Sequence, residues 1–552
     1  EHLAVDAIYP EWAIWESFVA DVYAQALGLD SLESSHPVEV TVNHPDEVNE
    51  IFDTISYAKG ASLIRMLHGA IGEEAFRTGL QSYLKKFSYK NTLSSDLWSA
   101  FSESSGTDVA KMMNEWCTKI GYPVVQVSSP APQRLCFCQE RFLATYDAKD
   151  QEKLQSTLWT IPIKVAAWNK ANPNDPEGPH MMRVLFDVQK GDYPSLGYTD
   201  DCVIKVNPGQ TGFYRTQYSD EIFHKIVPSI PILPQIERLG LLRDTYALGA
   251  SGRISIQDFL SMLQYYENDT NYAVVSALAS NLSMFASLHA DQPYYPSIQA
   301  LVRKVFRAGF ERLGWESTST GSTRTDTLQS IFRATILGMM VSVGEDPTCI
   351  QTGLAKFRAF AQDPTKPENN IPADLRALIY NLAAKKGDEK DLEALYKMYR
   401  ESELQEEKNR ILSVVGAVDP TSSDASTRID RALKFLLSDE VRPGNISFAM
   451  SGIGSSKLGR SRAWSWFQAS FPEIKERFCK GQNFIIAGLL SSMLAGWSST
   501  DILTQTDEFF QQNPIPQAAR TLSQLRESIT TKSVRLERER EAVAAWFAKN
   551  QA

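Results

Sequence analysis

The chain has 552 residues, and its 56 Lys and Arg against 66 Asp and Glu give a formal net charge of −10. The length allows several domains, and the acidic balance excludes a basic nucleic-acid-binding surface as the main feature. Hydrophobic residues at 43% and charged residues at 22% exclude a disordered, collagen-like or coiled-coil protein.

Residues 1–122 carry the apolar spacing of helices. Apolar residues three or four positions apart mark one helical face at residues 12–19 and another at residues 63–70. This block is therefore predicted to be mainly helical. We expect the face of the first helix to be exposed and to need a covering partner; it is formed by Trp12, Trp15 and Phe18.

The pattern changes at residue 123, where short stretches of alternating apolar residues begin. Segments rich in Pro, Asn, Asp and Gly separate these stretches, as is typical of strands joined by turns. The predicted strands are residues 125–127, 135–138, 161–167, 184–188 and 203–206. Residues 123–218 are therefore predicted to form a small β-sandwich.

From residue 219 to the last residue the helical spacing returns. Leu392, Leu395, Tyr396 and Tyr399 form one apolar helix face, and helix pairs joined by short polar turns predict stacked helical hairpins. No sequence signature recurs at a fixed period. Residues 535–541 alternate in charge, which favours a solvated helix face with ion pairs four residues apart.

The cysteines and the apolar stretches indicate the compartment. Six cysteines are scattered without C-x-x-C spacing, which is typical of free thiols in a reducing compartment, so we expect a cytoplasmic protein. Cys136 and Cys138 are predicted to share one face of a strand. No stretch reaches the roughly 20 apolar residues that span a bilayer, and the most apolar one, residues 484–497, is predicted to be a buried helix.

The histidines exclude one kind of metal site. None of the seven is three, four or five residues from another, so the zinc-binding pair H-E-x-x-H is not present in residues 1–552. A cluster of three distant histidines stays open. A phosphate-binding loop of the G-x-x-x-x-G-K-[ST] type and a G-x-S-x-G nucleophile turn are also missing from this sequence.

Several short blocks, taken together and in order, resemble the zinc aminopeptidases of the puromycin-sensitive type. The most specific is Ile55-Ser56-Tyr57-Ala58-Lys59-Gly60-Ala61-Ser62. The other blocks are residues 35–40, 44–48, 51–53, 97–98, 116, 121–123, 206–215, 243–252 and 459–464. The resemblance runs over nearly the whole chain.

The resemblance implies a multidomain α+β fold. Residues 1–122 would be the helical lobe of a thermolysin-like catalytic domain without its zinc-binding part. Residues 123–218 would be the β-sandwich, and residues 219–552 a large superhelical domain of the HEAT or armadillo kind.

The resemblance also assigns roles to individual residues. Tyr57 would donate a hydrogen bond to the substrate carbonyl oxygen that becomes negative in the transition state. Lys59 and Gly60 would shape the helix start beside Tyr57. Arg460 either lines a peptide-holding cavity or is a structural arginine.

One departure from the family leads to two hypotheses. By the register of the family, the chain begins just after the third zinc ligand, so Glu1 is not that ligand, and we expect no zinc on this chain and no peptidase activity in isolation. The first hypothesis is the C-terminal portion of a zinc aminopeptidase that removes N-terminal residues from peptides. The alternative is a non-catalytic module that binds peptides or a partner protein.

Expected partners follow from the same reasoning. Peptides are the expected ligands, and neither nucleic acid nor a membrane span is expected. A separate chain that supplies the upstream half, or self-association, would cover the apolar face of the first helix.

Overall fold

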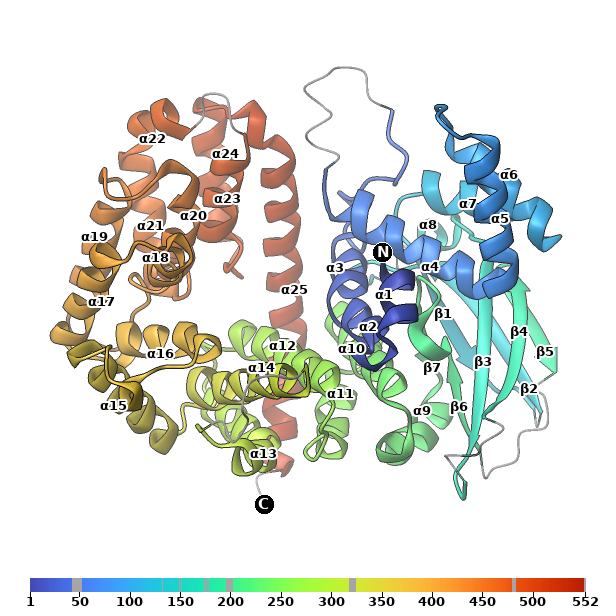
Figure 1. The fold of residues 1–552 in the computed structure, drawn as a ribbon, viewed down its shortest axis with the longest axis horizontal. Helices are drawn as coiled ribbons and strands as arrows, with labels where there is room; N and C mark the ends of the chain where they lie inside the picture. Colours follow the sequence, from blue (N-terminus) through green and yellow to red (C-terminus); the bar gives the residue numbers. More distant parts are fainter. Residues whose placement is uncertain are drawn as a thin grey trace. The chain divides into compact units, whose positions relative to one another are not determined.

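The computed structural model describes residues 1–41, 52–131, 133–147, 149, 151–172, 175, 178–194, 202–316, 324–478 and 483–550. Contacts between Cα atoms divide the chain into two compact units, Glu1–Asn281 and Leu282–Ala552. The described residues of the first unit form helices and two sheets, and those of the second form helices (Figure 1).

The helices of the first unit bury the apolar faces that their spacing predicts. Helix α4 (Gly60–Ile71) is an example, because Leu63, Met66 and Leu67 on one face are each at most 1% exposed. The other helical segments are α1 (His2–Ile8), η1 (Pro10–Trp12), α2 (Ile14–Phe18), η2 (Val19–Tyr23), α3 (Ala24–Leu29), η4 (Ile55–Lys59), α5 (Glu73–Lys86), α6 (Ser94–Ser105), α7 (Val109–Thr118), α8 (Gln151–Gln155), η6 (Pro208–Gln210), α9 (Asp220–Ile226), η7 (Val227–Ile232), α10 (Gln235–Ser251), α11 (Ile256–Met262), η8 (Leu263–Tyr265) and most of α12 (Tyr272–Leu288).

Aromatic residues near the N-terminus are less exposed than predicted. Phe18 is 2% exposed, and Trp12 and Trp15 are half-buried, so the expectation of an exposed Phe18 is wrong. The reason is local packing: His2 contacts the Phe18 ring edge at 5.1 Å between ring centroids, and the Arg65 guanidinium lies 5.4 Å above its face. Ile8 at 67% and Tyr9 at 44% are the exposed large apolar residues of this segment.

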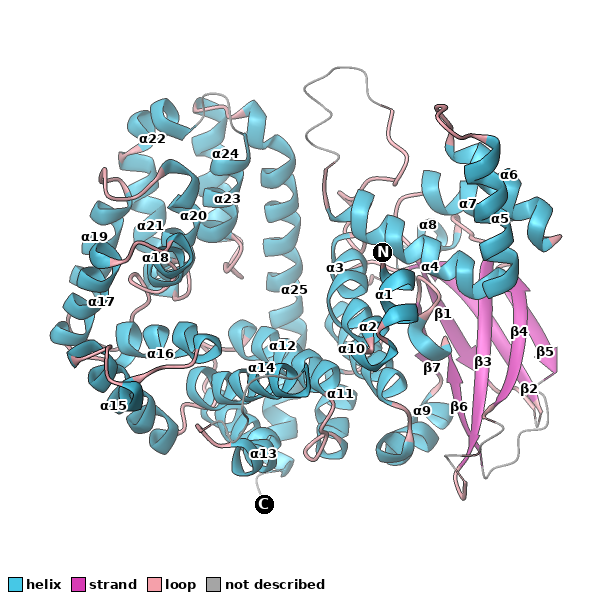
Figure 2. Ribbon diagram, in the orientation of Figure 1, coloured by secondary structure: helices cyan, strands magenta, loops and turns pink. Residues whose placement is uncertain are grey.

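The described residues of the first unit form two sheets. A four-stranded sheet has the order β5-β2-β1-β7 and a three-stranded sheet has the order β4-β3-β6 (Figure 2). Strands β5 and β7 were not predicted, and β4 begins four residues before the predicted stretch. The strands are β1 (Pro123–Ser128), β2 (Arg134–Arg141), β3 (Ile161–Asn169), β4 (His180–Phe186), β5 (Lys190–Pro194), β6 (Cys202–Val206) and β7 (Arg215–Tyr218).

The two sheets contact each other through aromatic side chains. Phe186 of β4 meets Phe137 of β2 at 6.1 Å and Tyr193 of β5 at 6.2 Å between ring centroids, both edge to face. Cys136 and Cys138 both lie on β2, two residues apart, as predicted. The buried face of each sheet therefore forms one layer of a shared core.

The second unit is built from helical hairpins. Leu392, Leu395, Tyr396 and Tyr399 of α17 (Glu389–Glu401) are all buried, as their spacing predicts. The other helical segments are α13 (Tyr295–Leu313), α14 (Arg324–Gly338), η9 (Met339–Val343), α15 (Pro347–Gln362), η10 (Pro367–Asn369), α16 (Ala373–Lys386), α18 (Gln405–Leu412), α19 (Ala425–Leu436), η11 (Pro443–Asn445), α20 (Ile446–Ile453), α21 (Lys457–Ala469), α22 (Phe471–Phe478), α23 (Asn483–Leu494), α24 (Asp501–Gln512), η12 (Pro516–Ala518) and α25 (Ala519–Asn550).

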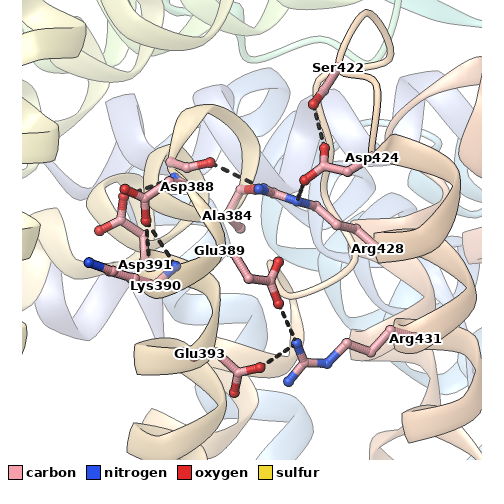
Figure 3. Close-up of polar contacts among 11 residues, drawn as sticks. Ala384, Asp388, Glu389, Lys390, Asp391, Glu393, Ser422, Asp424, Arg428 and Arg431 are labelled. Carbon is pink, nitrogen blue, oxygen red and sulfur yellow. Dashed lines mark hydrogen bonds and ion pairs between the residues drawn. The ribbon is translucent and has the colours of Figure 1, made fainter.

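Basic side chains connect several neighbouring hairpins. Arg428 on α19 donates to the carbonyl of Ala384 at 3.4 Å, at the end of α16, and to Asp424 at 2.7 Å (Figure 3). On the same helix, Arg431 reaches Glu389 at 2.9 Å and Glu393 at 2.7 Å on α17. Contacts of this kind recur between residues 39 to 42 positions apart, namely Arg303 with Gly344, Arg307 with Asp346, Lys356 with Glu316, Arg400 with Glu440, Arg428 with Gly387, Arg431 with Glu389 and Arg477 with Leu437.

Helix α25 carries the charge-alternating segment. Arg535 donates to Glu539 at 2.8 Å, which is the predicted pair four residues apart. Glu539 is nevertheless only 3% exposed, because its other oxygen lies 3.4 Å from Nε2 of the fully buried His289. The prediction of a solvated face is therefore wrong at Glu539, which joins α25 to the end of α12.

An ion pair in the second unit makes the stability depend on pH in acid. Lys386 donates to Asp419 at 2.8 Å. Burial alone would raise the pKa of Asp419, but hydrogen bonds from Lys386 and Thr421 lower this pKa from its ordinary 3.8 to about 2. The folded state therefore has the lower pKa, so the pair stabilises the fold above about pH 4 and loses this contribution as the pH falls toward 2.

We expect Asp419→Asn to be destabilised by about 1 kcal/mol at pH 7 and to lose less stability than the wild type between pH 4 and pH 2. Urea unfolding at each pH measures both values. The control is Asp439→Asn, because Asp439 is exposed and forms no ion pair within the described residues. Equal acid slopes for wild type and Asp419→Asn would contradict the prediction.

Within the described ranges, no single helix is long and apolar enough to cross a membrane. The segments Thr327–Val343 and Pro347–Gln362 pass that test only as a pair bent by 111°.

Candidate functional site

Tyr57 lies on a π-helical turn that leads into α4. The turn is η4 (Ile55–Lys59), and its hydrogen-bonded backbone continues directly into Gly60. The Tyr57 side chain is 64% exposed, and its ring lies 6.1 Å from the ring of Phe52, which is equally exposed. Single π turns inserted at a helix end often occur at functional sites, because they turn one side chain out of the regular register.

Lys59 holds this turn in place through buried polar contacts. Its ammonium group is fully buried and forms an ion pair with the equally buried Asp30 at 2.9 Å. It also donates to the carbonyl of Gly121 at 3.0 Å and to that of Lys119 at 3.3 Å. Asp30 in turn accepts a hydrogen bond from the Gly121 amide at 3.0 Å and from Ser35 at 2.7 Å.

This network joins three segments that are far apart in the sequence. Asp30 follows α3, Lys59 ends η4, and Gly121 lies between α7 and β1. The buried ion pair, together with the hydrogen bonds that Gly121 makes to both of its members, restricts each segment to one position. The exposed Tyr57 therefore lies two residues before Lys59, whose position is held by this network.

Asp53 holds the start of the same turn. One carboxylate oxygen accepts hydrogen bonds from the amides of Ile55 at 2.9 Å and Ser56 at 3.0 Å, and the other lies 2.6 Å from Nε2 of His36. Burial alone would raise the pKa of Asp53, but the hydrogen bonds from His36 and from the two amides lower it. Nδ1 of His36 lies 2.8 Å from the carbonyl of Pro37, so only the doubly protonated ring donates to both oxygens.

Gly60 does not make space for a neighbour. Its φ is −52°, and a Cβ placed on it meets no described atom within 4 Å. Packing therefore does not require a glycine at position 60. The contacts that shape the turn come from Lys59, as predicted, and from Asp53.

We expect Gly60→Ala to raise the free energy of unfolding by about 0.5–1 kcal/mol, because alanine favours the helix and restricts the unfolded chain. Thermal and urea unfolding measure this change. Gly79→Ala is the matched contrast, because a Cβ at Gly79 would lie 2.7 Å from the Phe101 ring and should destabilise. A loss of stability in Gly60→Ala would contradict the conclusion that packing does not require a glycine at position 60.

Arg460 belongs to the second unit and contacts helix ends. It lies on α21 and donates to the carbonyl of Gly454, which ends α20, at 3.1 Å. Its guanidinium lies 5.9 Å from the centre of the Trp497 ring. Burial lowers the pKa of Arg460. These contacts explain a structural arginine, and its role toward a peptide stays a prediction.

The described residues do not fit a zinc centre. They contain no group of three His, Cys, Asp or Glu side chains arranged to hold a metal ion. His36 is occupied by Asp53, and His289 by Glu539 and Tyr294. His44 and residues 45–48 of the predicted family block lie outside the described residues.

Sequence reasoning found Tyr57 but not the groups that fix it. The block around Tyr57 contains Lys59, yet no local pattern shows that Lys59 is buried against Asp30. His36 and Asp53 lie in separate blocks of the family resemblance. Only the fold shows that these two side chains meet at the start of the turn.

Two family models match the chain. The Peptidase family M1 domain matches residues 1–116, which contain Tyr57 and its anchors, and the ERAP1-like C-terminal domain matches residues 203–531. The chain belongs to the M1 family of peptidases. Members of this family are in general zinc-dependent aminopeptidases that act on peptides.

Named relatives agree with this assignment. Aminopeptidase M1 of Arabidopsis thaliana is 32% identical over 536 residues, which are 95% of this chain and 58% of the relative. The alanine/arginine aminopeptidase of Saccharomyces cerevisiae is 30% identical over 98% of this chain and 60% of its own length. The puromycin-sensitive aminopeptidase of Caenorhabditis elegans is 29% identical over 87% of this chain and 49% of its own length. The chain thus spans about half to three-fifths of these relatives.

Proposed function

We propose that this chain is the C-terminal portion of a zinc-dependent aminopeptidase that removes N-terminal residues from peptides. The observation that carries the proposal is Tyr57, whose phenol is 64% exposed while Lys59, two residues later, is fully buried. In this role the Tyr57 hydroxyl donates a hydrogen bond to the carbonyl oxygen of the peptide bond as negative charge develops there. A donor held in place before the reaction contributes about 3 kcal/mol to such a step.

We further propose that residues 1–552 alone hold no zinc and hydrolyse no peptide. The sequence has no pair of histidines at helical spacing, and the described side chains offer no three-ligand group. Bound zinc would supply the Lewis acid and the activated water of this family, so its ligands have to come from elsewhere.

The domain organisation is part of the proposal. Residues 1–122 would be the helical lobe of the catalytic domain, residues 123–218 a β-sandwich and residues 219–552 a HEAT- or armadillo-like array. The contact between Phe137 and Phe186 across the sheets supports the sandwich. Seven polar contacts between residues 39 to 42 positions apart support the array, since such repeats are about 40 to 47 residues long. Other ion pairs of this unit are 32 or 33 residues apart.

A cytoplasmic location and a covering partner complete the proposal. The described cysteines are free thiols, which fits a reducing compartment. The exposed Ile8 and Tyr9 form an apolar surface that either a chain with the zinc-binding half or a second copy would cover.

The test has two stages. The purified chain, supplied with zinc, should show no stoichiometric metal by mass spectrometry and no hydrolysis of aminoacyl arylamides. A polypeptide that joins the upstream part of the Arabidopsis relative to Glu1 should hydrolyse them, and Tyr57→Phe should lower its kcat about 10²-fold with little change in KM.

Tyr89→Phe is the matched control, because Tyr89 is fully exposed and lies in the loop after α5, outside η4. Hydrolysis by the chain alone would contradict the proposed lack of activity. An unchanged kcat in Tyr57→Phe would contradict the role of Tyr57.

The second candidate function is a non-catalytic module that binds peptides or a partner protein. A groove of about 880 Å³ favours it. Its apolar part is lined by Leu433 of α19, by Leu437, which directly follows α19, and by Leu458 and Trp466 of α21. Binding of a peptide blocked at its N-terminus, without hydrolysis in the joined polypeptide, would support this candidate over the enzyme.

A further inference from the structure

Two cations face each other on the three-stranded sheet without a carboxylate. Lys164 of β3 is paired directly with Arg183 of β4, so their side chains stand on the same face of the sheet. Neither has an ion-pair partner among the described residues. Like charges at directly opposite positions destabilise a sheet, so this pair needs an explanation.

The ammonium group of Lys164 occupies space that a glycine of α4 leaves open. Its Nζ and the Oγ1 of Thr211 both lie close to Gly69 of α4, at 3.2 Å and 3.3 Å from where a Cβ would be. Any side chain at position 69 would therefore push against the ammonium group. A glycine inside a helix lowers the stability of the helix by about 1 kcal/mol relative to alanine. The space that Gly69 leaves for Lys164 therefore comes at the expense of helix stability.

A third cation adds to the positive potential at this place. Arg65, one turn before Gly69 on α4, donates to the carbonyls of Gly209 and Gln210 at 2.8 Å and 2.7 Å. Burial, with the charges of Arg183 and Arg65, lowers the pKa of Lys164. The carbonyl end of α4 offsets part of the charge of Lys164. Arg183, which is exposed, has no such compensation.

The neighbours of Arg183 indicate what kind of ligand fits. Met181 and Leu185, two residues away on either side, are 40% and 53% exposed and lie on the same face, opposite Ala166 and Pro162. Strand β4 is at the edge of its sheet, and no other described strand pairs with its outer side. The edge thus offers unpaired backbone groups together with the side-chain order apolar, cationic, apolar.

We propose that this edge is a docking site for an extended acidic peptide segment. The segment adds as a strand beside β4, places one carboxylate over Arg183 and Lys164, and packs apolar side chains two residues away against Met181 and Leu185. A free small anion uses the cations but leaves the apolar residues and the strand edge without a role. The site lies on the sheet, apart from Tyr57, and does not depend on the proposed aminopeptidase function.

Binding of a labelled peptide to the full chain tests the proposal. The probe is the nine-residue peptide Thr-Thr-Val-Thr-Glu-Thr-Val-Thr-Thr, in which Val, Glu and Val, each two residues apart, share one face of the strand. It is blocked at both ends so that neither terminus contributes. We expect it to bind at least about 10-fold more tightly than the same peptide with Gln in place of Glu, measured by fluorescence anisotropy at low salt. Equal binding of the two peptides would overturn the proposal.

Two variants and a control assign the binding to this site. Arg183→Glu and Lys164→Gln should each lower the affinity for the Glu peptide by about 10-fold or more. Arg134→Glu, which changes an exposed cation on β2 of the other sheet, should bind as the wild type does. Unchanged binding in Arg183→Glu would overturn the site.

A stability measurement separates loss of binding from loss of fold. Arg183→Glu replaces two facing cations by an opposite-charge pair, so we expect its Tm to rise by about 1–2 °C as its peptide affinity falls. A lower Tm would overturn the premise that the native pair is strained by repulsion.

Hydrogen exchange tests strand addition itself. The amides of residues 180–186 should exchange more slowly when the Glu peptide is bound, because the outer edge of β4 becomes paired. Unchanged exchange there, or displacement of the peptide by an equal concentration of inorganic phosphate, would assign a simple anion site and overturn peptide docking.

Discussion

Lys59→Met should lower the free energy of unfolding of the chain by about 3–5 kcal/mol. Methionine fits the volume of the lysine stem but leaves Asp30 as a buried carboxylate without a counter-charge. The carbonyls of Gly121 and Lys119 also lose their donor. Urea unfolding followed by tryptophan fluorescence measures the change.

A double variant separates the charge from the packing. In Asp30→Asn combined with Lys59→Met no net charge is left buried, so the loss should be clearly smaller than the sum of the two single losses. Lys85→Met, on the exposed side of α5, should stay within about 0.5 kcal/mol of the wild type. Additive losses in the double variant would contradict a tight coupling of Asp30 and Lys59.

Glu539→Leu should have a comparable effect in the second unit, about 3–5 kcal/mol. Leucine removes the carboxylate that pairs with Arg535 at 2.8 Å and faces His289 at 3.4 Å. Arg535 is only 11% exposed, so its charge would remain largely buried. Thermal and urea unfolding of the full chain report the loss.

Glu537→Leu is the matched control for that experiment. It makes the same change two residues away on the same helix, where the side chain is exposed, and should change stability by no more than about 0.5 kcal/mol. Equal effects of the two substitutions would show that burial of Glu539 does not matter.

Much of the fold could be predicted because burial leaves a periodic pattern in the sequence. The helix with Leu392 and Tyr396 and the strand with Ile161 and Val165 repeat apolar residues with the period of their structure. Strands β5 and β7 escaped prediction because their sequences, Lys-Gly-Asp-Tyr-Pro and Arg-Thr-Gln-Tyr, lack that alternation. Their pairing with β2 and β1 places them in the sheet, and pairing is a long-range property.

The candidate site was predictable only in part, for the same reason. Tyr57 stands in a recognisable local block, so family resemblance could assign it a role. The partners Asp30 of Lys59 and His36 of Asp53 are set by how separate segments meet. Charge alternation at residues 535–541 misled for a related reason, because the burial of Glu539 depends on His289, which lies 250 residues earlier.

The contact between α25 and the turn after α12 has a consequence for how the second unit holds together. Stacked hairpins usually form an open row, in which the end repeats can separate first. Here the last helix returns to the first: the rings of Phe547 and Tyr294 stack at 6.2 Å, and Glu539 meets His289. The row thus becomes a closed loop without a free end. Because its own termini meet, the unit should accept circular permutation, with new ends opened in one of its exposed turns.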